Sequence, residues 1–504
     1  MNFNFELPRR STGIACLAVV LIAAAGESIA ASRPNIVFIL IDDLRRDLVG
    51  YNGHPFLKTP HIDKLAHGGA RFSHAFVTTS LCSPSRASYL TGQYMHNHGV
   101  VDNHTAIPQG TSTFPQLLRK AGYETAFIGK WHMGGSRDDP RPGFDHWVSF
   151  RGQGRYQPDG RKLNVDGRHV PRTTYMTDEL TNYAVEWIRS RASDTPFMLE
   201  LSHKGIHGLY IPAPRHRGVY KNAEWSPPAT MADTPENRAG RPLWALDQRN
   251  SWHGVEFPYY LRSGESLEEM YRHSCEMMLS IDESVGRVVA ALKEQGLFEN
   301  TLIVFTSDGG HLWGEHGLID KRCAYEESMR VPLAMHHPKL IASGTVISSF
   351  ATNLDIAPTF LELAGVPIPE QMDGRSLVGL FKGGAEVENW RDEVLYEYYW
   401  EWSYPQTPTT FALRTEDYKL IQYHGIWDQD ELYNIVADPH ETTNLIRNPE
   451  QQKRVNQMRR RLHEMLKETD GLTIPLGFKR GPGNTLRNPN GSTRAEFPPS
   501  MIHD

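Results

Sequence analysis

The stretch Asn-Ile-Val-Phe-Ile-Leu-Ile at residues 35–41 is followed at once by Asp42 and Asp43, and it decides how the chain is interpreted. Its apolar side chains run continuously, which is typical of a strand buried on both faces of a parallel sheet. Runs at 196–202 and 301–306 have the same character. Alternation of such strands with helices predicts an α/β fold with a large, mostly parallel sheet sandwiched by helices. The expected helices lie at 61–76, 113–121, 176–191 and 265–296.

The C-terminal part of the chain has a different pattern. From about residue 390, short aromatic segments at 394–400, 411–414 and 418–421 are followed by a polar helical pattern near 448–468. Short strands of this kind predict a small antiparallel sheet with one helix. A Pro- and Gly-rich stretch then completes the chain, which is typical of wrapping or frayed coil.

The composition is that of a soluble globular protein, and the N-terminal segment predicts that it is exported. The 504 residues carry a net charge of −6, which gives no basic surface for nucleic acid. Arg9 and Arg10 precede an apolar run at 13–25, and Ser-Ile-Ala at 28–30 supplies small residues for cleavage after Ala30. The run falls short of a bilayer span, so we expect no membrane anchor. These features predict a signal peptide and a periplasmic or secreted protein.

Cysteine usage argues against a disulfide framework. Only Cys82, Cys275 and Cys323 remain after removal of residues 1–30, an odd and low number for an exported chain. A single bridge between Cys275 and Cys323 stays possible. Cys82 has to remain free for the role that its surroundings indicate.

The stretch Leu-Cys-Ser-Pro-Ser-Arg-Ala-Ser-Tyr-Leu-Thr-Gly at residues 81–92 predicts a helix that begins near Cys82. Pro84 suits the first helical turn because its missing N–H has no partner there in any case. Unpaired N–H groups and the helix dipole favour negative charge at such a terminus. Arg86, one turn further on, can point back to the same place. The pattern indicates a site for an oxyanion.

Carboxylates follow two of the predicted buried strands. Asp42 and Asp43 come after the first strand, and Asp308 comes after the strand at 301–306. Ligands collect at the carboxyl ends of parallel strands, and oxygen donors of this kind suit a hard divalent cation. An aspartate in such a position can instead cap the following helix or turn. Together with the Cys82 stretch, the pattern favours a metal site.

Several segments in sequence order carry a resemblance to one known family. Cys-Ser-Pro-Ser-Arg at 82–86, with Leu-Thr-Gly at 90–92, resembles the signature of the type I sulfatases of the alkaline phosphatase superfamily. Gly-Lys-Trp-His-Met-Gly at 129–134, Lys-Gly-Ile-His at 204–207 and Gly-Glu-His-Gly-Leu-Ile-Asp-Lys at 314–321 are similar to further family segments. The resemblance extends from about residue 35 to about residue 445.

The resemblance implies both a cofactor and roles for individual residues. In this family a maturation enzyme converts the cysteine, here Cys82, to formylglycine, whose hydrated aldehyde is the nucleophile. The implied metal is calcium rather than magnesium. Its implied ligands are Asp42, Asp43, Asp308 and the modified Cys82. The implied catalytic residues are Cys82, Arg86, Lys130, His132, His207 and Lys321, and we expect Asn103, Arg215 and His311 to contact substrate.

These implications predict an exported sulfatase that hydrolyses sulfate monoesters, most plausibly of a sulfated carbohydrate. Aromatic side chains in loops, such as Trp225, Trp244, Trp252 and the pair Tyr259-Tyr260, could stack on sugar faces. Two alternatives stay open. One is a phosphonate monoester or phosphodiester hydrolase of the same superfamily, and the other is an inactive glycan-binding protein with the sulfatase fold.

The resemblance also implies a division of the chain into four parts. They are a signal peptide at 1–30, a sulfatase catalytic domain at 31–390, a C-terminal α+β subdomain at 391–471 and a tail at 472–504.

One position departs from the family pattern. After the strand-end aspartate the family usually has Asn, Gln or His, whereas here Gly309 follows Asp308. Gly309 could be a turn residue that needs a positive φ. We expect water or His311 to fill the gap around the cation, because calcium tolerates variable ligand number. On that expectation, Gly309→Asn would lower the calcium concentration that the protein needs.

Overall fold

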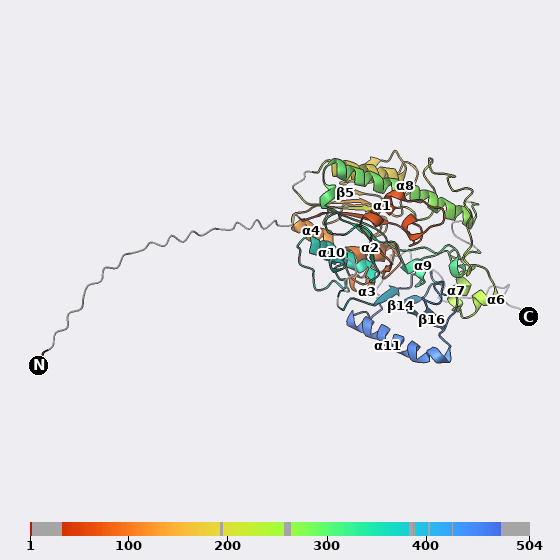
Figure 1. The fold of residues 1–504 in the computed structure, drawn as a ribbon. Helices are drawn as coiled ribbons and strands as arrows, with labels where there is room; N and C mark the ends of the chain where they lie inside the picture. Colours follow the sequence, from red (N-terminus) through yellow and green to blue (C-terminus); the bar gives the residue numbers. More distant parts are fainter. Residues whose placement is uncertain are drawn as a thin grey trace, which may run out of the picture. The chain divides into compact units, whose positions relative to one another are not determined.

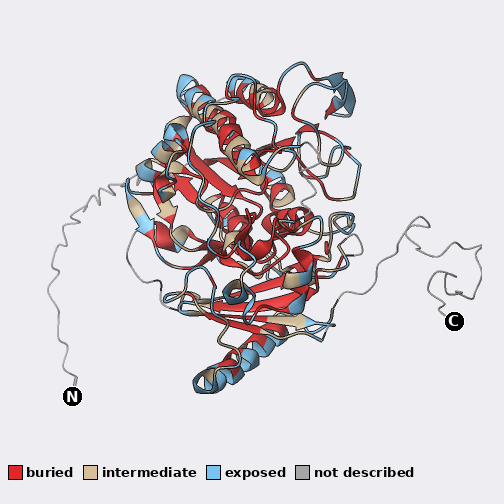
Figure 2. Cartoon of the chain, turned by 90° about the vertical axis from the view of Figure 1, so that its right-hand side faces the viewer, coloured by how far each residue is buried: buried red, intermediate tan, exposed pale blue. Residues whose placement is uncertain are grey.

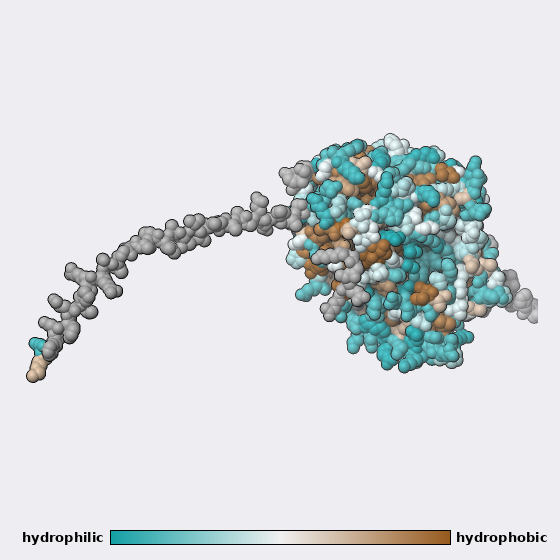
Figure 3. Space-filling view, in the orientation of Figure 1, coloured by the Kyte–Doolittle hydropathy of each residue, from teal (hydrophilic) through white to brown (hydrophobic). Residues whose placement is uncertain are grey.

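The structure is a computed structural model that describes residues 1–2, 33–191, 195–256, 264–382, 387, 389–401, 404–425 and 427–474. The predicted signal peptide from residue 3 onward, Tyr259-Tyr260 and the predicted tail from residue 475 lie outside the described residues. Among the residues described, no helix combines the length and apolar character needed to cross a membrane. The face seen in Figure 3 is largely hydrophilic, with apolar residues gathered in separate patches.

A ten-stranded sheet forms the centre of the catalytic part, and its middle strand β1 (Asn35–Ile41) has the bounds that the sequence predicts. β1 pairs in parallel with β8 (Phe197–Ser202) on one side and with β9 (Thr301–Ser307) on the other. The remaining strands in sheet order are β11 (Thr345–Ile347), β2 (Ala70–Phe72) and β10 (Ala334–His336) beyond β9, and β4 (Glu124–Gly129), β5 (His146–Ser149), β6 (Lys162–Val165) and β7 (Arg168–Pro171) beyond β8.

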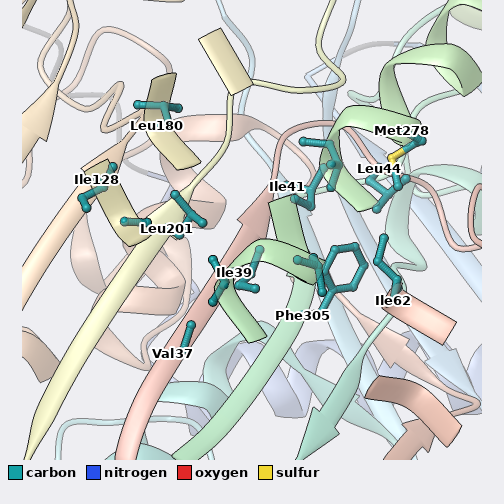
Figure 4. Packing of buried hydrophobic residues seen from close by; sticks show 14 of the residues in the cluster. Val37, Ile39, Ile41, Leu44, Ile62, Ile128, Leu180, Leu201, Met278 and Phe305 are labelled. Atoms are coloured by element: carbon teal, nitrogen blue, oxygen red, sulfur yellow. The ribbon is translucent and has the colours of Figure 1, made fainter. Parts of the chain in front are cut away.

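The side chains of β1 divide between two hydrophobic clusters, as expected for a strand covered on both faces. Val37, Ile39 and Ile41 belong to one cluster (Figure 4), where they lie among Leu180, Leu201, Met278 and Phe305. Ile36, Phe38 and Leu40 belong to the other cluster, with Ala87 and Phe360. Figure 2 shows the central strands of the sheet buried beneath helices whose outer faces are exposed, whereas the edge strand β7 is exposed. The alternation of side chains places half of the strand in each layer.

Helices cover both faces of the sheet. In Figure 1, α1 (Pro60–Gly68) and α8 (Leu267–Glu294) lie on one side, and α2 (Cys82–Thr91) and α10 (Ile356–Leu363) lie on the opposite side. α5 (Met176–Arg189) packs against α8, and α4 (Phe114–Lys120) packs against α10. Met277 and Met278 of α8 are buried in the core. Short helices complete this part: α3 (Met95–His98), α6 (Pro235–Arg238), α7 (Leu243–Gln248) and α9 (Glu326–Met329).

The C-terminal part is the predicted small antiparallel sheet with a helix. Its strands in order are β13 (Glu393–Tyr398), β14 (Thr409–Thr415), β15 (Tyr418–His424) and β16 (Glu431–Asn434). The helix α11 (Gln452–Glu468) buries Val455, Leu462 and Met465 in a cluster with sheet residues such as Leu413 and Leu420. The fold class is confirmed, whereas the limits of the four predicted domains stay a prediction.

The predicted helix at 61–76 is wrong beyond its first half. α1 ends at Gly68, and the chain continues as β2 and the short strand β3 (Ala75–Phe76), which pairs with β12 (Ala351–Thr352). The cause is a close approach of two backbones, because a Cβ at Gly69 would lie 2.2 Å from the carbonyl oxygen of Met335 in β10. Only glycine permits that contact, and it turns the chain into the edge of the sheet.

The sheet is mostly parallel, as predicted. It is parallel from β9 to β5, whereas β10 pairs antiparallel with β9 and with β2, and β6 pairs antiparallel with β5 and β7. The possible bridge between Cys275 and Cys323 does not form. Both thiols are free and buried, with Cys275 Sγ 3.8 Å from His54 and Cys323 in a separate cluster.

The N-terminus of α1 depends on a carboxylate from α8. Thr59, the N-cap residue, makes no side-chain capping bond. Instead, Asp282 accepts hydrogen bonds from the amides of His61 at 2.9 Å and Ile62 at 2.8 Å, and its side chain is buried.

We therefore expect Asp282→Ala to lower the free energy of unfolding by about 2 kcal/mol, because two buried amides lose their acceptor. Glu283→Ala, one residue along α8, removes contacts of a half-exposed carboxylate with Arg215 and His216, for which we expect less than about 1 kcal/mol. Urea denaturation measures both values. Equal losses in the two variants would show that Asp282 is not the cap.

Candidate active site

Three buried carboxylates meet where β1 and β9 end. Asp42 and Asp43 follow β1, Asp308 follows β9, and the parallel register pairs Ile41 with Ser307. Asp43 adopts a left-handed φ of 63°, and its amide donates to Asp308 Oδ1 at 3.1 Å. One oxygen of each carboxylate lies within 4.8 Å of the others. The three side chains therefore form an oxygen-rich group of the kind that holds a hard divalent cation.

Burial of these carboxylates opposes their ionisation, and neighbouring cations offset it to different extents. Burial raises the pKa of Asp308 to about 7, although Arg86 acts in the other direction. Burial likewise raises the pKa of Asp43 above its ordinary value. For Asp42, burial opposes ionisation, but Lys130 and the other neighbouring cations hold its pKa well below the usual range. A further cation would favour the charged form of all three groups.

Cys82 is the first residue of α2 and is fully buried. Its thiol donates to Asp42 Oδ1 at 3.4 Å, and the Nζ of Lys321 lies 2.8 Å from its sulfur. Burial raises the pKa of the Cys82 thiol to about 12. The unmodified side chain is therefore a neutral thiol and a poor nucleophile near neutral pH.

Three cations balance the three carboxylates, one for each. The Nε of Arg86 donates to Asp308 Oδ2 at 2.7 Å. Lys130 contacts Asp42 directly, and Lys321 contacts Asp43. These cations are 0–5% exposed. Buried charges require pairing of this kind, so each carboxylate has a cation beside it that stabilises its ionised form.

Two neutral histidines face this group. His132 Nδ1 lies 3.2 Å from the hydroxyl oxygen of Ser83, and burial lowers the pKa of His132 well below its ordinary value. The Nδ1 of His207 donates to the carbonyl of Gly208 at 2.6 Å, which leaves its Nε2 unprotonated 3.8 Å from Asp43. Burial also lowers the pKa of His207. Both rings can therefore accept a proton.

A cavity of about 510 Å³ opens above the site. His207 and Lys321 are among the residues that line it, and no Asp or Glu occurs among its described lining residues. Its lining is strongly basic, with Arg155, Arg161, Lys204, Lys321 and Arg322. The local charge is thus positive although the chain as a whole is acidic, which suits an anionic ligand.

One of the three residues predicted to contact substrate lines the cavity, and the other two do not. Asn103 lines the cavity, and its Oδ1 also accepts from the amide of Ser83 in the first turn of α2 at 3.0 Å. Arg215 is absent from the lining and pairs with Asp178 at 2.7 Å and with Glu283, on α5 and α8. His311 is also absent from the lining, is buried, and packs against Trp313 at 5.2 Å between ring centres.

Gly309 has a packing role. Its φ is not in the left-handed region, so it is not the positive-φ turn residue that the sequence allowed. A Cβ at this position would lie 2.7 Å from the carbonyl oxygen of Ser80, two residues before Cys82. The expectation that asparagine here would improve metal binding is therefore corrected, because the side chain has no room next to that carbonyl.

Sequence reasoning missed part of the site. Lys204 lies in one of the quoted family segments, lines the cavity with its Nζ 4.2 Å from the ring centre of Tyr156, and has its pKa lowered to about 7 by burial. Ser202 Oγ accepts from Arg86 at 2.5 Å. Of the aromatic residues predicted to meet sugar, Trp252 lines the cavity and is 57% exposed, whereas Trp244 is buried in a core cluster.

Comparisons with known proteins agree with this geometry. A family model for sulfatases matches residues 34–366, and a second model, for the C-terminal part of N-sulphoglucosamine sulphohydrolase, matches residues 314–468. The chain is 33% identical over 493 residues to an N-acetylglucosamine-6-O-sulfatase of Bacteroides thetaiotaomicron, covering 86% of this chain and 87% of that protein. It is 30% identical over 485 residues to human N-acetylglucosamine-6-sulfatase, covering 85% and 83%.

A solved structure shows the same architecture. BT4656, in complex with its substrate D-glucosamine-2-N,6-O-disulfate, superposes with a TM-score of 0.79 at 31% identity, covering 87% of this chain and 98% of that chain. Members of the family generally use a formylglycine and a divalent cation. The family match covers more than half of the chain, and the fold agrees with it. The chain belongs to the sulfatase family and is a sulfuric ester hydrolase.

Proposed function

We propose that this sulfatase hydrolyses sulfate monoesters of a sulfated carbohydrate, with a formylglycine made from Cys82 and a bound calcium ion. One observation carries the proposal: Cys82 is buried at the start of α2, among paired carboxylates and cations, beneath a cavity with a basic lining. We also propose that residues 1–30 are a signal peptide and that the mature enzyme is exported.

The residues present fit a divalent cation. Asp42, Asp43 and Asp308 offer oxygen donors within 4.8 Å of one another, and burial raises the pKa of Asp43 and Asp308, which a cation would reverse. When bound there, calcium would polarise oxygen atoms at the site and stabilise negative charge. The site has three carboxylates and three cationic side chains. A bound calcium ion would therefore add positive charge, which complements a sulfate group.

The residues of the chain itself supply positioning and proton transfer. Arg86 holds Asp308 in place, with 2.7 Å between Nε and Oδ2, and Lys321 lies 2.8 Å from the reacting position at Cys82. Lys321 and Lys130 are placed to offset charge that develops on sulfate oxygens. His207 presents an unprotonated Nε2 to the site, and His132 is held beside Ser83, so both can exchange protons with reacting oxygens.

The form of the cavity supports a carbohydrate. Its volume of about 510 Å³ is within the range of small-molecule sites, and Trp252 offers an exposed aromatic surface of the kind that stacks on sugars. Arg155 and Arg161 extend the basic lining beyond Lys321. The relatives named for N-acetylglucosamine 6-sulfate and the disulfated glucosamine complex point to sulfated glucosamine as the first substrate to test.

We expect the enzyme secreted by its native host to lack residues 1–30 and to be about 18 Da lighter than the mature sequence predicts, because a thiol becomes an aldehyde. Intact-mass measurement reads both changes, and fragmentation assigns the loss to the peptide with Cys82. Cys82→Ala should keep its thermal stability and lose turnover. A fully active Cys82→Ala enzyme, or an unmodified thiol in active enzyme, would contradict the mechanism.

On the best substrate from a panel of defined sulfated mono- and oligosaccharides, we expect Lys321→Ala to lower kcat/KM by about a hundredfold. A cation aimed at developing charge is typically worth that much. Steady-state kinetics measures the loss, and circular dichroism checks that the variant folds.

The matched control is Lys339→Ala, because Lys339 is exposed and lies outside the cavity lining. Near-normal kinetics for Lys321→Ala would show that the cation has been misassigned. Faster turnover of a phosphonate monoester or a phosphodiester than of any sulfated sugar would favour the alternative hydrolase.

Activity should be lost on chelation and return with calcium, and we expect both Gly309→Ala and Gly309→Asn to raise the calcium concentration for half-maximal activity, by about tenfold. The added Cβ is common to both variants and presses on the Ser80 carbonyl. Gly379→Ala is the control, because a Cβ there meets Val387 at an ordinary 3.4 Å. A lower calcium requirement in Gly309→Asn alone would restore the missing-ligand interpretation.

A further inference from the structure

A second group of metal-binding side chains lies outside the catalytic site. His316 is in the short 3-10 helix Glu315–Gly317, Glu327 is in α9, and Glu441 is in the loop that follows β16. One ring nitrogen of His316 and one oxygen of each glutamate lie within 4.8 Å of one another. This group, the His316 cluster, shares no residue with the carboxylates around Cys82.

Two of the three donor groups of the His316 cluster have atoms without a hydrogen-bond partner in the described chain, whereas Glu441 accepts from the amide of Glu326 at 2.8 Å. His316 is 6% exposed, and neither of its ring nitrogens has a hydrogen-bond partner in the described part of the chain. The Oε2 of Glu327 is also buried without a partner among the described residues. Buried polar atoms are almost always satisfied, so an imidazole nitrogen and a carboxylate oxygen that lie close together without partners call for a ligand that bonds to both.

The backbone at His316 orients its side chain. Its φ is 58°, a left-handed conformation that histidine adopts more often than most residues. Here the conformation places the imidazole in the cluster, with its ring centre 3.9 Å from that of Tyr325.

The cations around the cluster pair with the two glutamates next to Glu327. Lys419 pairs with Glu326 at 3.2 Å and with Glu441 at 2.6 Å, and both Arg414 and Arg330 also pair with Glu326. No ion pair occurs for Glu327 within the described residues, so a bound cation would supply the partner that its buried Oε2 lacks.

We propose that the His316 cluster binds a zinc ion that ties the loop after β16 to α9. The mixed donor set decides the metal, because imidazole nitrogen with carboxylate oxygen suits Zn²⁺, whereas calcium takes oxygen ligands. Water completes the tetrahedral coordination of the ion. The ion is structural, since the cluster is separate from Cys82 and joins the C-terminal sheet region to the catalytic part. This inference does not depend on the proposed substrate.

The test uses the full-length mature enzyme, stripped with a chelator and returned to buffer that contains calcium throughout. Zinc is then added, unbound metal is removed, and elemental analysis and thermal unfolding are measured. We expect roughly one equivalent of retained zinc and a rise in Tm of about 3 °C. His316→Asn, which keeps a residue that tolerates the left-handed φ, and the isosteric Glu327→Gln should each lose the retained zinc and the Tm rise.

Cys82→Ala is the control that separates the two sites, because Asp42, Cys82 and His207 also form a group that could hold a metal. It should retain zinc and the rise in Tm as the wild type does. Zinc lost from Cys82→Ala but kept by His316→Asn would place the ion in the catalytic site and overturn the proposal. Zinc retained by both cluster variants, or no zinc bound by the wild type, would overturn it as well.

Discussion

The buried ion pair between Arg86 and Asp308 is the contact on which the site depends. Arg86 is 3% exposed and Asp308 is fully buried, and 2.7 Å separates their closest atoms. A buried charge that loses its partner costs several kcal/mol, so neither residue can change alone. Through Ser202 and the carbonyl of Lys130, the same guanidinium also joins the ends of β8 and β4 to α2.

The parallel sheet explains why these groups meet. β1 lies between β8 and β9 in parallel register, so the residues after all three strands emerge at one edge. Asp42 and Asp308 arrive there on rigid strands, and Cys82 arrives at the N-terminus of α2 on the adjoining layer. Lys321 comes from a loop, and its position is fixed by Asp43 and the Cys82 sulfur. The scaffold therefore places a neutral thiol among balanced charges, away from bulk water.

Much of this arrangement could be predicted from sequence, because the relevant signals are local. A continuous apolar run gives β1 its exact bounds, and polar residues directly after such runs mark the functional edge. The predictions that were wrong concern residues whose positions depend on contacts between distant segments. The backbone of Met335 ends α1 at Gly68, and the carbonyl of Ser80 excludes a side chain at Gly309. Likewise, Arg215 is drawn to two acids on α5 and α8 that no linear pattern identifies.

The most direct test of the account is whether sulfate is transferred to position 82. Cys82→Ser enzyme, which offers one hydroxyl where formylglycine would offer two, is incubated with a sulfated sugar and digested for mass spectrometry. We expect the peptide with residue 82 to gain about 80 Da, the mass of one sulfuryl group, because a single hydroxyl cannot release it. Sulfate on another residue, or sustained turnover by this variant with no gain at position 82, would contradict the assignment of Cys82 as the reacting residue.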